Sequence, residues 1–75
     1  MKLRVDDHQA AESLVRFFRR RDYLAVHEPR GTVEVVPIRS VSERTDRIQT
    51  LRDLGEWRAE NPGAAVRPSG EGADV

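Results

Sequence analysis

The segment Y-L-A-V-H-E-P-R-G-T-V-E-V-V-P-I, residues 23–38, decides the fold that this sequence predicts. It contains two runs of strand-forming residues, 23–28 and 32–38, separated by Pro29-Arg30-Gly31. Proline fixes its own φ and glycine tolerates a positive φ, so this tripeptide favours a tight turn. Two strands joined by so short a turn form an antiparallel hairpin. The hairpin is therefore the centre from which the other elements are placed.

Before the hairpin, the sequence predicts one strand and one helix. Residues 1–5 alternate between polar and apolar side chains, which is typical of a strand with one buried side. Asp6 then stands three residues before Gln9, the spacing of a helix N-terminal capping box. From there to about Arg21 apolar side chains recur at i, i+3, i+4 and i+7, which predicts an amphipathic helix. Its expected buried side chains are Ala11, Leu14, Val15 and Phe18.

After the hairpin, a second helix is expected to start at a serine cap, either Ser40 or Ser42, and to reach about Glu60. Asn61-Pro62-Gly63 then ends it. The large aliphatic residues predict the buried stripe of this helix, so truncating its central leucine to alanine should cost about 2–5 kcal/mol. That stripe comprises Ile48, Leu51 and Leu54.

The order of elements is thus β-α-β-β-α. Residues 64–67 could add a short last strand. This is the order of the ferredoxin-like split βαβ fold, an α+β fold with an antiparallel sheet and two helices on one face. We expect residues 1–67 to form a single domain and 68–75 to be a disordered C-terminal tail. The open side of the sheet should carry Lys2, Arg4, Glu34 and Val36.

Composition narrows the function classes. Basic and acidic residues are equal in number, 13 of each, so the formal net charge is zero. Proteins that bind nucleic acids or membrane surfaces normally carry an excess of basic residues. The balanced charge of this chain therefore argues against both kinds of partner. The lack of cysteine excludes disulfides, thiolate metal sites and thiol catalysis. No apolar run is long enough to cross a bilayer or to act as a signal peptide. We therefore expect a cytoplasmic protein.

One group of residues has the chemistry of a ligand or metal site. In the split βαβ fold, the end of the first strand and the hairpin turn lie at the same end of the sheet. Asp6, Asp7 and His8 follow the first strand, and the turn brings His27 and Glu28 to the same rim. Imidazoles with carboxylates can bind divalent cations. Helix capping and solvation explain the same residues, so we keep a metal or small-ligand sensor as an alternative and assign no metal.

The sequence contains one basic cluster, on the last turns of the first helix. Arg16, Arg19 and Arg20 stand there together with Arg21. They could contact a phosphate backbone or an acidic protein surface. Cations at a helix C-terminus also simply complement the helix dipole. The net charge of zero and the lack of aromatic residues on the strands 1–5 and 32–38 argue against nucleic-acid binding. We therefore keep a weak nucleic-acid binder only as a second alternative.

Three further residues are candidates for contacts with a partner. Trp57 either fills the groove between the two helices or anchors a partner from the surface, and the groove is favoured. Residues 23–28 form an edge strand, whose unpaired backbone could join a second copy across a two-fold axis. In that dimer Tyr23 and His27 line the seam, and Val26 of the same strand is a further candidate for contact with a partner.

The chain also lacks a glycine-rich phosphate loop, an H-E-x-x-H motif and a nucleophile elbow. We therefore expect no enzyme and no cofactor. The leading hypothesis is a small interaction or regulatory module that binds protein, and a homodimer in particular, because a domain of this size buries only a thin core.

Overall fold

A computed structural model describes residues 1–68 of the chain. The expected tail therefore lies outside the described residues, except for Pro68, which belongs to a strand. The elements are β1 (Lys2–Val5), α1 (His8–Arg19), β2 (Tyr23–Glu28), β3 (Thr32–Pro37), α2 (Glu43–Glu60) and β4 (Val66–Pro68).

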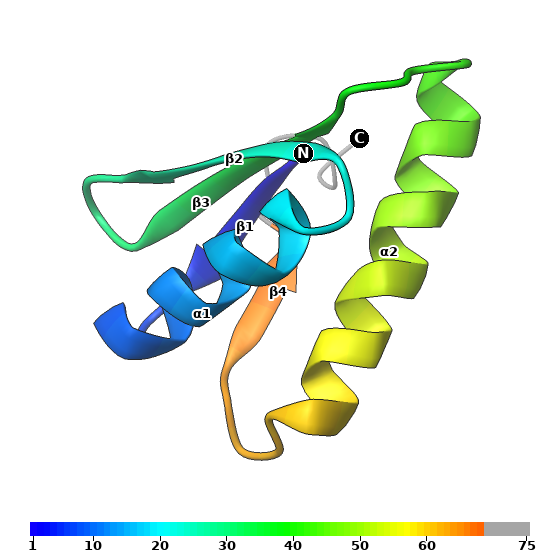
Figure 1. Ribbon diagram of the computed structural model, residues 1–75. Helices are drawn as coiled ribbons and strands as arrows, with labels where there is room; N and C mark the ends of the chain where they lie inside the picture. Colours follow the sequence, from blue (N-terminus) through cyan, green and yellow to red (C-terminus); the bar gives the residue numbers. More distant parts are fainter. Residues whose placement is uncertain (69–75) are drawn as a thin grey trace.

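The four strands form one antiparallel sheet in the order β2-β3-β1-β4, with β2 and β4 at its edges. Both helices lie on the same side of this sheet (Figure 1). This α+β arrangement confirms the fold class, and its strand order is compatible with a ferredoxin-like fold. The last strand that the sequence left open is present, with Val66 paired to Val5 and Pro68 to Leu3.

The hairpin turn is held against the end of β1. Gly31 has a φ of +75°, and a Cβ at this position would lie 2.8 Å from the carbonyl oxygen of Val5. The backbone is this close because Val5 N–H donates to the Gly31 carbonyl at 2.7 Å. Only glycine fits such an approach at a positive φ. The contact places the residues that follow β1 next to the turn, which is the geometry that the fold predicted for the rim.

The helix caps differ in part from the expected ones. Asp7, rather than Asp6, is the N-cap of α1, and its Oδ2 accepts the Ala10 N–H at 2.9 Å. Ser42, rather than Ser40, is the N-cap of α2, and its Oγ accepts the Thr45 N–H at 3.1 Å. A cap requires the side-chain oxygen to reach the N–H of N2 or N3, and each true cap lies one residue before its helix.

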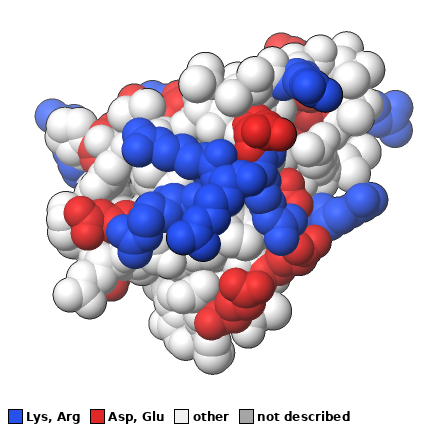
Figure 2. Space-filling model, viewed as in Figure 1, with Lys and Arg blue, Asp and Glu red and all other residues white. Residues whose placement is uncertain are grey.

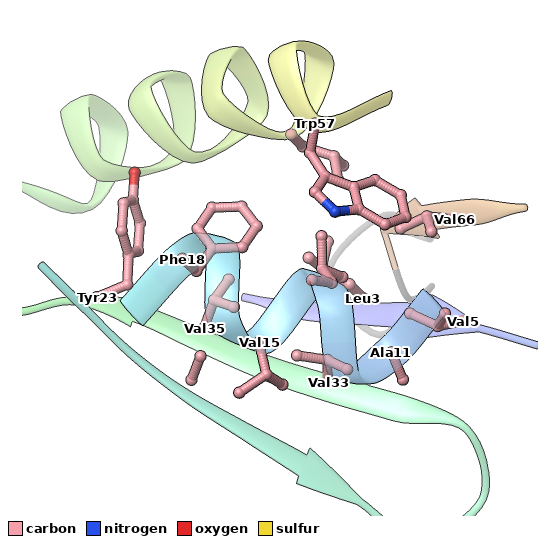
Figure 3. Close-up of a cluster of buried hydrophobic side chains, with 13 residues drawn as sticks. Leu3, Val5, Ala11, Val15, Phe18, Tyr23, Val33, Val35, Trp57 and Val66 are labelled. Carbon is pink, nitrogen blue, oxygen red and sulfur yellow. The ribbon is translucent and has the colours of Figure 1, made fainter. Parts of the chain in front are cut away.

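The core lies between the sheet and the two helices (Figure 3). Every expected buried residue of α1 is buried, because the helical period of its apolar residues turns them to the sheet. On the strands, alternation sends one set inward and leaves the opposite side open. Lys2, Arg4, Glu34 and Val36 lie on the open side as expected. The fully buried strand residues are Leu3, Val5, Val33 and Val35.

The buried face of α2 is where the sequence prediction was wrong. Ile48 is 54% exposed and Leu51 is 39% exposed, and only Leu54 of the expected stripe is buried. The helix instead turns Thr50, Asp53 and Trp57 inward. The polar atoms of Asp53 and Trp57 have partners elsewhere in the fold, Arg21 and Tyr23 for Asp53 and Ser13 of α1 for Trp57. A pattern of aliphatic residues in the sequence does not show such partners. The expected cost of 2–5 kcal/mol for Leu51→Ala assumed burial and does not apply to this position.

Trp57 is part of the core, with 1% of its surface exposed. Its indole lies between α2 and α1, close to Leu3 and Val66 (Figure 3). Nε1 donates to Ser13 Oγ of α1 at 3.3 Å, so the one polar atom of the ring is satisfied. The groove interpretation is therefore confirmed, and Trp57 is not available as a surface anchor.

Candidate interaction surface

The rim residues meet as the topology predicted. His8, in the first turn of α1, and His27, near the end of β2, have ring centroids 5.1 Å apart and are tilted by 45°. Both line an open hollow together with Asp6, Glu28 and Arg30. β3 separates the strand of His27 from β1, so this proximity comes from the helix start and the turn.

Two of the carboxylates near the histidines, Asp7 and Glu28, are directed to other groups, whereas Glu12 pairs with His8. Asp7 caps α1 through its side chain. Glu28 lies 3.8 Å from Lys2 Nζ, and Glu12 lies 3.5 Å from His8 Nε2. Within residues 1–68, no group of three or more His, Asp or Glu side chains could hold a metal ion. The fold thus brings His8 and His27 together, but Asp7 and Glu28 do not form a metal site with them.

The arginines of α1 have different surroundings. Arg16, Arg19 and Arg20 are all exposed, and Figure 2 shows basic side chains gathered across the face where α1 lies. Arg19 is nevertheless committed, because its Nε donates to the carbonyl oxygen of Ala25 on β2 at 3.1 Å. Neither Arg16 nor Arg20 forms an ion pair with a described residue. The cluster therefore offers fewer free cations than the sequence suggested.

The side chain of Tyr23 is buried, so Tyr23 offers its backbone, and not its side chain, to the expected dimer seam. It is 2% exposed, and its hydroxyl donates to Asp53 Oδ2 at 2.7 Å. Arg21 donates to the other oxygen of Asp53 at 2.9 Å and to Glu56 at 2.7 Å. The Arg21 guanidinium also lies 4.5 Å from the centre of the Phe17 ring. These contacts form a polar clamp, defined by Arg21, Tyr23, Asp53 and Glu56, that joins α2 to the end of α1 and the start of β2.

Sequence analysis missed the clamp. Its members are separated by 30 and 32 residues in the chain for the two bonds to Asp53. The hydrogen bond to Glu56 is the main cause that raises the pKa of the Arg21 guanidinium. One sequence signal was available: an aspartate four residues before a tryptophan shares the helix face of that tryptophan.

The polar clamp should make the stability of the fold depend on pH in the alkaline range. Burial, assisted by the hydrogen bond to Asp53, raises the pKa of Tyr23 from 10.0 to about 12. The neutral phenol thus stabilises the fold fully below pH 10, and this stabilisation is lost as pH rises from 10 to 12. Tyr23 is the only tyrosine, so phenolate absorbance follows it alone. We expect the folded midpoint near 12 and the urea-unfolded midpoint near 10. Equal midpoints would contradict the clamp.

The open side of the sheet carries an apolar patch on the β2–β3 hairpin. Leu24 and Val36 pair directly across the two strands, and Val26 lies opposite Glu34. Leu24 is 61% exposed, Val26 53% and Ile38, just past β3, 58%. We call Leu24, Val26, Val36 and Ile38 the hairpin patch. Only Val26 was expected at a partner contact, although alternation alone places Leu24 beside it.

The hairpin patch adjoins an unpaired edge. β2 has a neighbour on one side only, so the other side of its backbone faces away from the sheet. Edge strands with strand-forming, uncharged middles are the places where another strand can add. In β2 that middle is Leu24-Ala25-Val26, as expected. Apolar side chains and free backbone groups therefore meet at one border of the molecule.

Comparison of this chain with protein-family models, curated proteins and solved structures finds no match. In residues 1–68, neither helix has the length and apolar character needed to cross a membrane.

Proposed function

We propose that this protein is a non-enzymatic interaction module that associates with a second copy of itself through the β2–β3 hairpin. The observation that carries the proposal is the hairpin patch: of the seven large apolar residues that are exposed among residues 1–68, four lie on this hairpin or directly after it. Contiguous apolar surface on a small domain is typical of protein contacts. Small secreted domains usually depend on disulfides, and this chain has no cysteine, so we place its function in the cytoplasm. The proposed module works without a cofactor.

Two rivals are less well supported. A nucleic-acid interface on α1 would rely on Arg16 and Arg20, because Arg19 and Arg21 already have partners in the fold. A small-ligand site at the rim is favoured by one observation, the 5.1 Å approach of His8 and His27. A rise in melting temperature with zinc or nickel, lost in His27→Ala, would support that second candidate.

The patch is tested by a charge placed within it. We expect Val26→Lys to shift the monomer–dimer equilibrium towards monomer, because the ammonium would have to be desolvated in the interface. The measurement is the concentration dependence of the mass in sedimentation equilibrium. Ile48→Lys is the matched control: Ile48 is 54% exposed and Val26 53%, but Ile48 lies on α2.

The two variants separate the outcomes. Weaker association for Val26→Lys with an unchanged Ile48→Lys supports the proposal. A monomer at all concentrations in the unmodified protein, or an equal effect of both substitutions, contradicts it.

A further inference from the structure

The register of the hairpin determines which backbone groups of β2 point away from β3. Ile38 N–H donates to the Asp22 carbonyl at 3.0 Å, and the β2–β3 pairs continue this register along the hairpin. In an antiparallel ladder, hydrogen-bonded pairs alternate with pairs that direct their N–H and C=O groups away from each other. Leu24 and Val26 therefore bond to β3. The N–H and C=O groups of Tyr23, Ala25 and His27 point to the free edge.

We infer that a second copy of this chain adds at this edge, antiparallel to β2, with the two-fold axis at Ala25. This rests on the proposed self-association and states its geometry. The residues whose backbone groups point outward are spaced symmetrically about Ala25. Ala25 therefore pairs with Ala25 of the second copy, and Tyr23 pairs with His27 of the second copy. This register uses all the outward groups of both strands, and a shift by two residues leaves part of them unpaired.

The side chains on the open side of the sheet support the same register. With Ala25 on the axis, Leu24 lies opposite Val26 of the second copy, and Val26 opposite Leu24. Direct cross-strand neighbours of this kind contribute to strand pairing. The two hairpin patches then form one continuous apolar strip, which gives Leu24 and Val26 a buried flank that they lack in the single chain.

The charges on α1 are self-complementary under the same axis. Residues 8, 12, 16 and 19 share one side of the helix. The ends of this ridge are fixed at β2: His8 contacts His27, and Arg19 bonds to Ala25. The ridge therefore borders the free edge, with Glu12 and Arg16 in its middle. A two-fold axis sets the two copies of α1 antiparallel, which brings Glu12 towards Arg16 of the second copy.

Arg19 covers part of the free edge of β2. Its bond to the Ala25 carbonyl occupies the group that would lie at the centre of the new pairing. A second strand must displace this guanidinium, so Arg19 holds the dimer weak. Removing the side chain should therefore tighten association, an effect opposite to that of removing an ordinary contact residue.

The test combines three changes, all followed by sedimentation equilibrium of the full chain. Glu12→Arg and Arg16→Glu should each weaken the dimer about threefold to tenfold, as expected for exposed charge pairs, and the double variant should restore it. Arg19→Ala should tighten the dimer, while Arg20→Ala is the control arginine without a bond to β2. His27→Pro removes an outward N–H and leaves the β2–β3 ladder intact, so it should give monomer.

The outcomes distinguish this inference from the proposed function. If Val26→Lys breaks the dimer while the charge exchange and Arg19→Ala have no effect, self-association stands and the edge register is wrong. Should His27→Pro fail to fold, the exchange between Glu12 and Arg16 decides, since both side chains are exposed. A monomer in every variant and in the unmodified chain overturns both proposals.

Discussion

Trp57→Ala is expected to lower the free energy of unfolding by about 3–5 kcal/mol. The indole is 1% exposed and fills the space between α1, α2 and the sheet, and its Nε1 bonds to Ser13. A domain of this length has a total stability of about 4–11 kcal/mol. The loss therefore removes a large part of the stability, and urea unfolding followed by circular dichroism measures it.

Two further variants make this result interpretable. Trp57→Phe keeps an aromatic ring and loses the bond to Ser13, so it should fold even if the alanine variant does not. Leu51→Ala is the control on the same helix, and at 39% exposure we expect it to cost less than about 1 kcal/mol. A Leu51→Ala variant as unstable as Trp57→Ala would mean that α2 buries a different face.

Asp53→Ala is expected to have the second largest effect, a loss of about 2–4 kcal/mol. The change leaves the buried Tyr23 hydroxyl without its acceptor and removes one of the two carboxylates that hold Arg21. Since Arg21 is 38% exposed, water compensates part of the lost ion pair. We expect the melting temperature to fall, and the emission of the single tryptophan to move to longer wavelength as α2 loosens.

The control for Asp53 is the other carboxylate of the clamp. Glu56 is 49% exposed, and its one ion pair within residues 1–68 is with the Arg21 guanidinium, so Glu56→Ala should cost less than about 1 kcal/mol. A double-mutant cycle of Asp53→Ala with Tyr23→Phe isolates their bond, and we expect a clearly non-additive result. Additive losses, or equal losses for Glu56→Ala and Asp53→Ala, would show that the clamp does not hold α2.

Much of the candidate surface was predictable from particular residues. Alternation in 23–28 placed Leu24 and Val26 on one side, and the position of this strand in the fold placed it at an edge. The approach of His8 to His27 followed from the same topology. The bond from Arg19 to the Ala25 carbonyl was not predictable, because no sequence pattern shows which carbonyl a long side chain will reach.

The sequence by itself determined the first five elements, their order and the buried side of α1, because these depend on periodicity and turn chemistry over a few neighbouring residues. Tertiary structure decided the buried side of α2 and the burial of Tyr23. Ile48, Leu51 and Leu54 are the aliphatic choice for a core, yet the helix turns Asp53 and Trp57 inward. Their partners Tyr23 and Ser13 lie 30 and 44 residues away in the chain. A buried polar group is stable only with a partner in place, so the rotation of α2 follows from contacts that exist only in the folded chain.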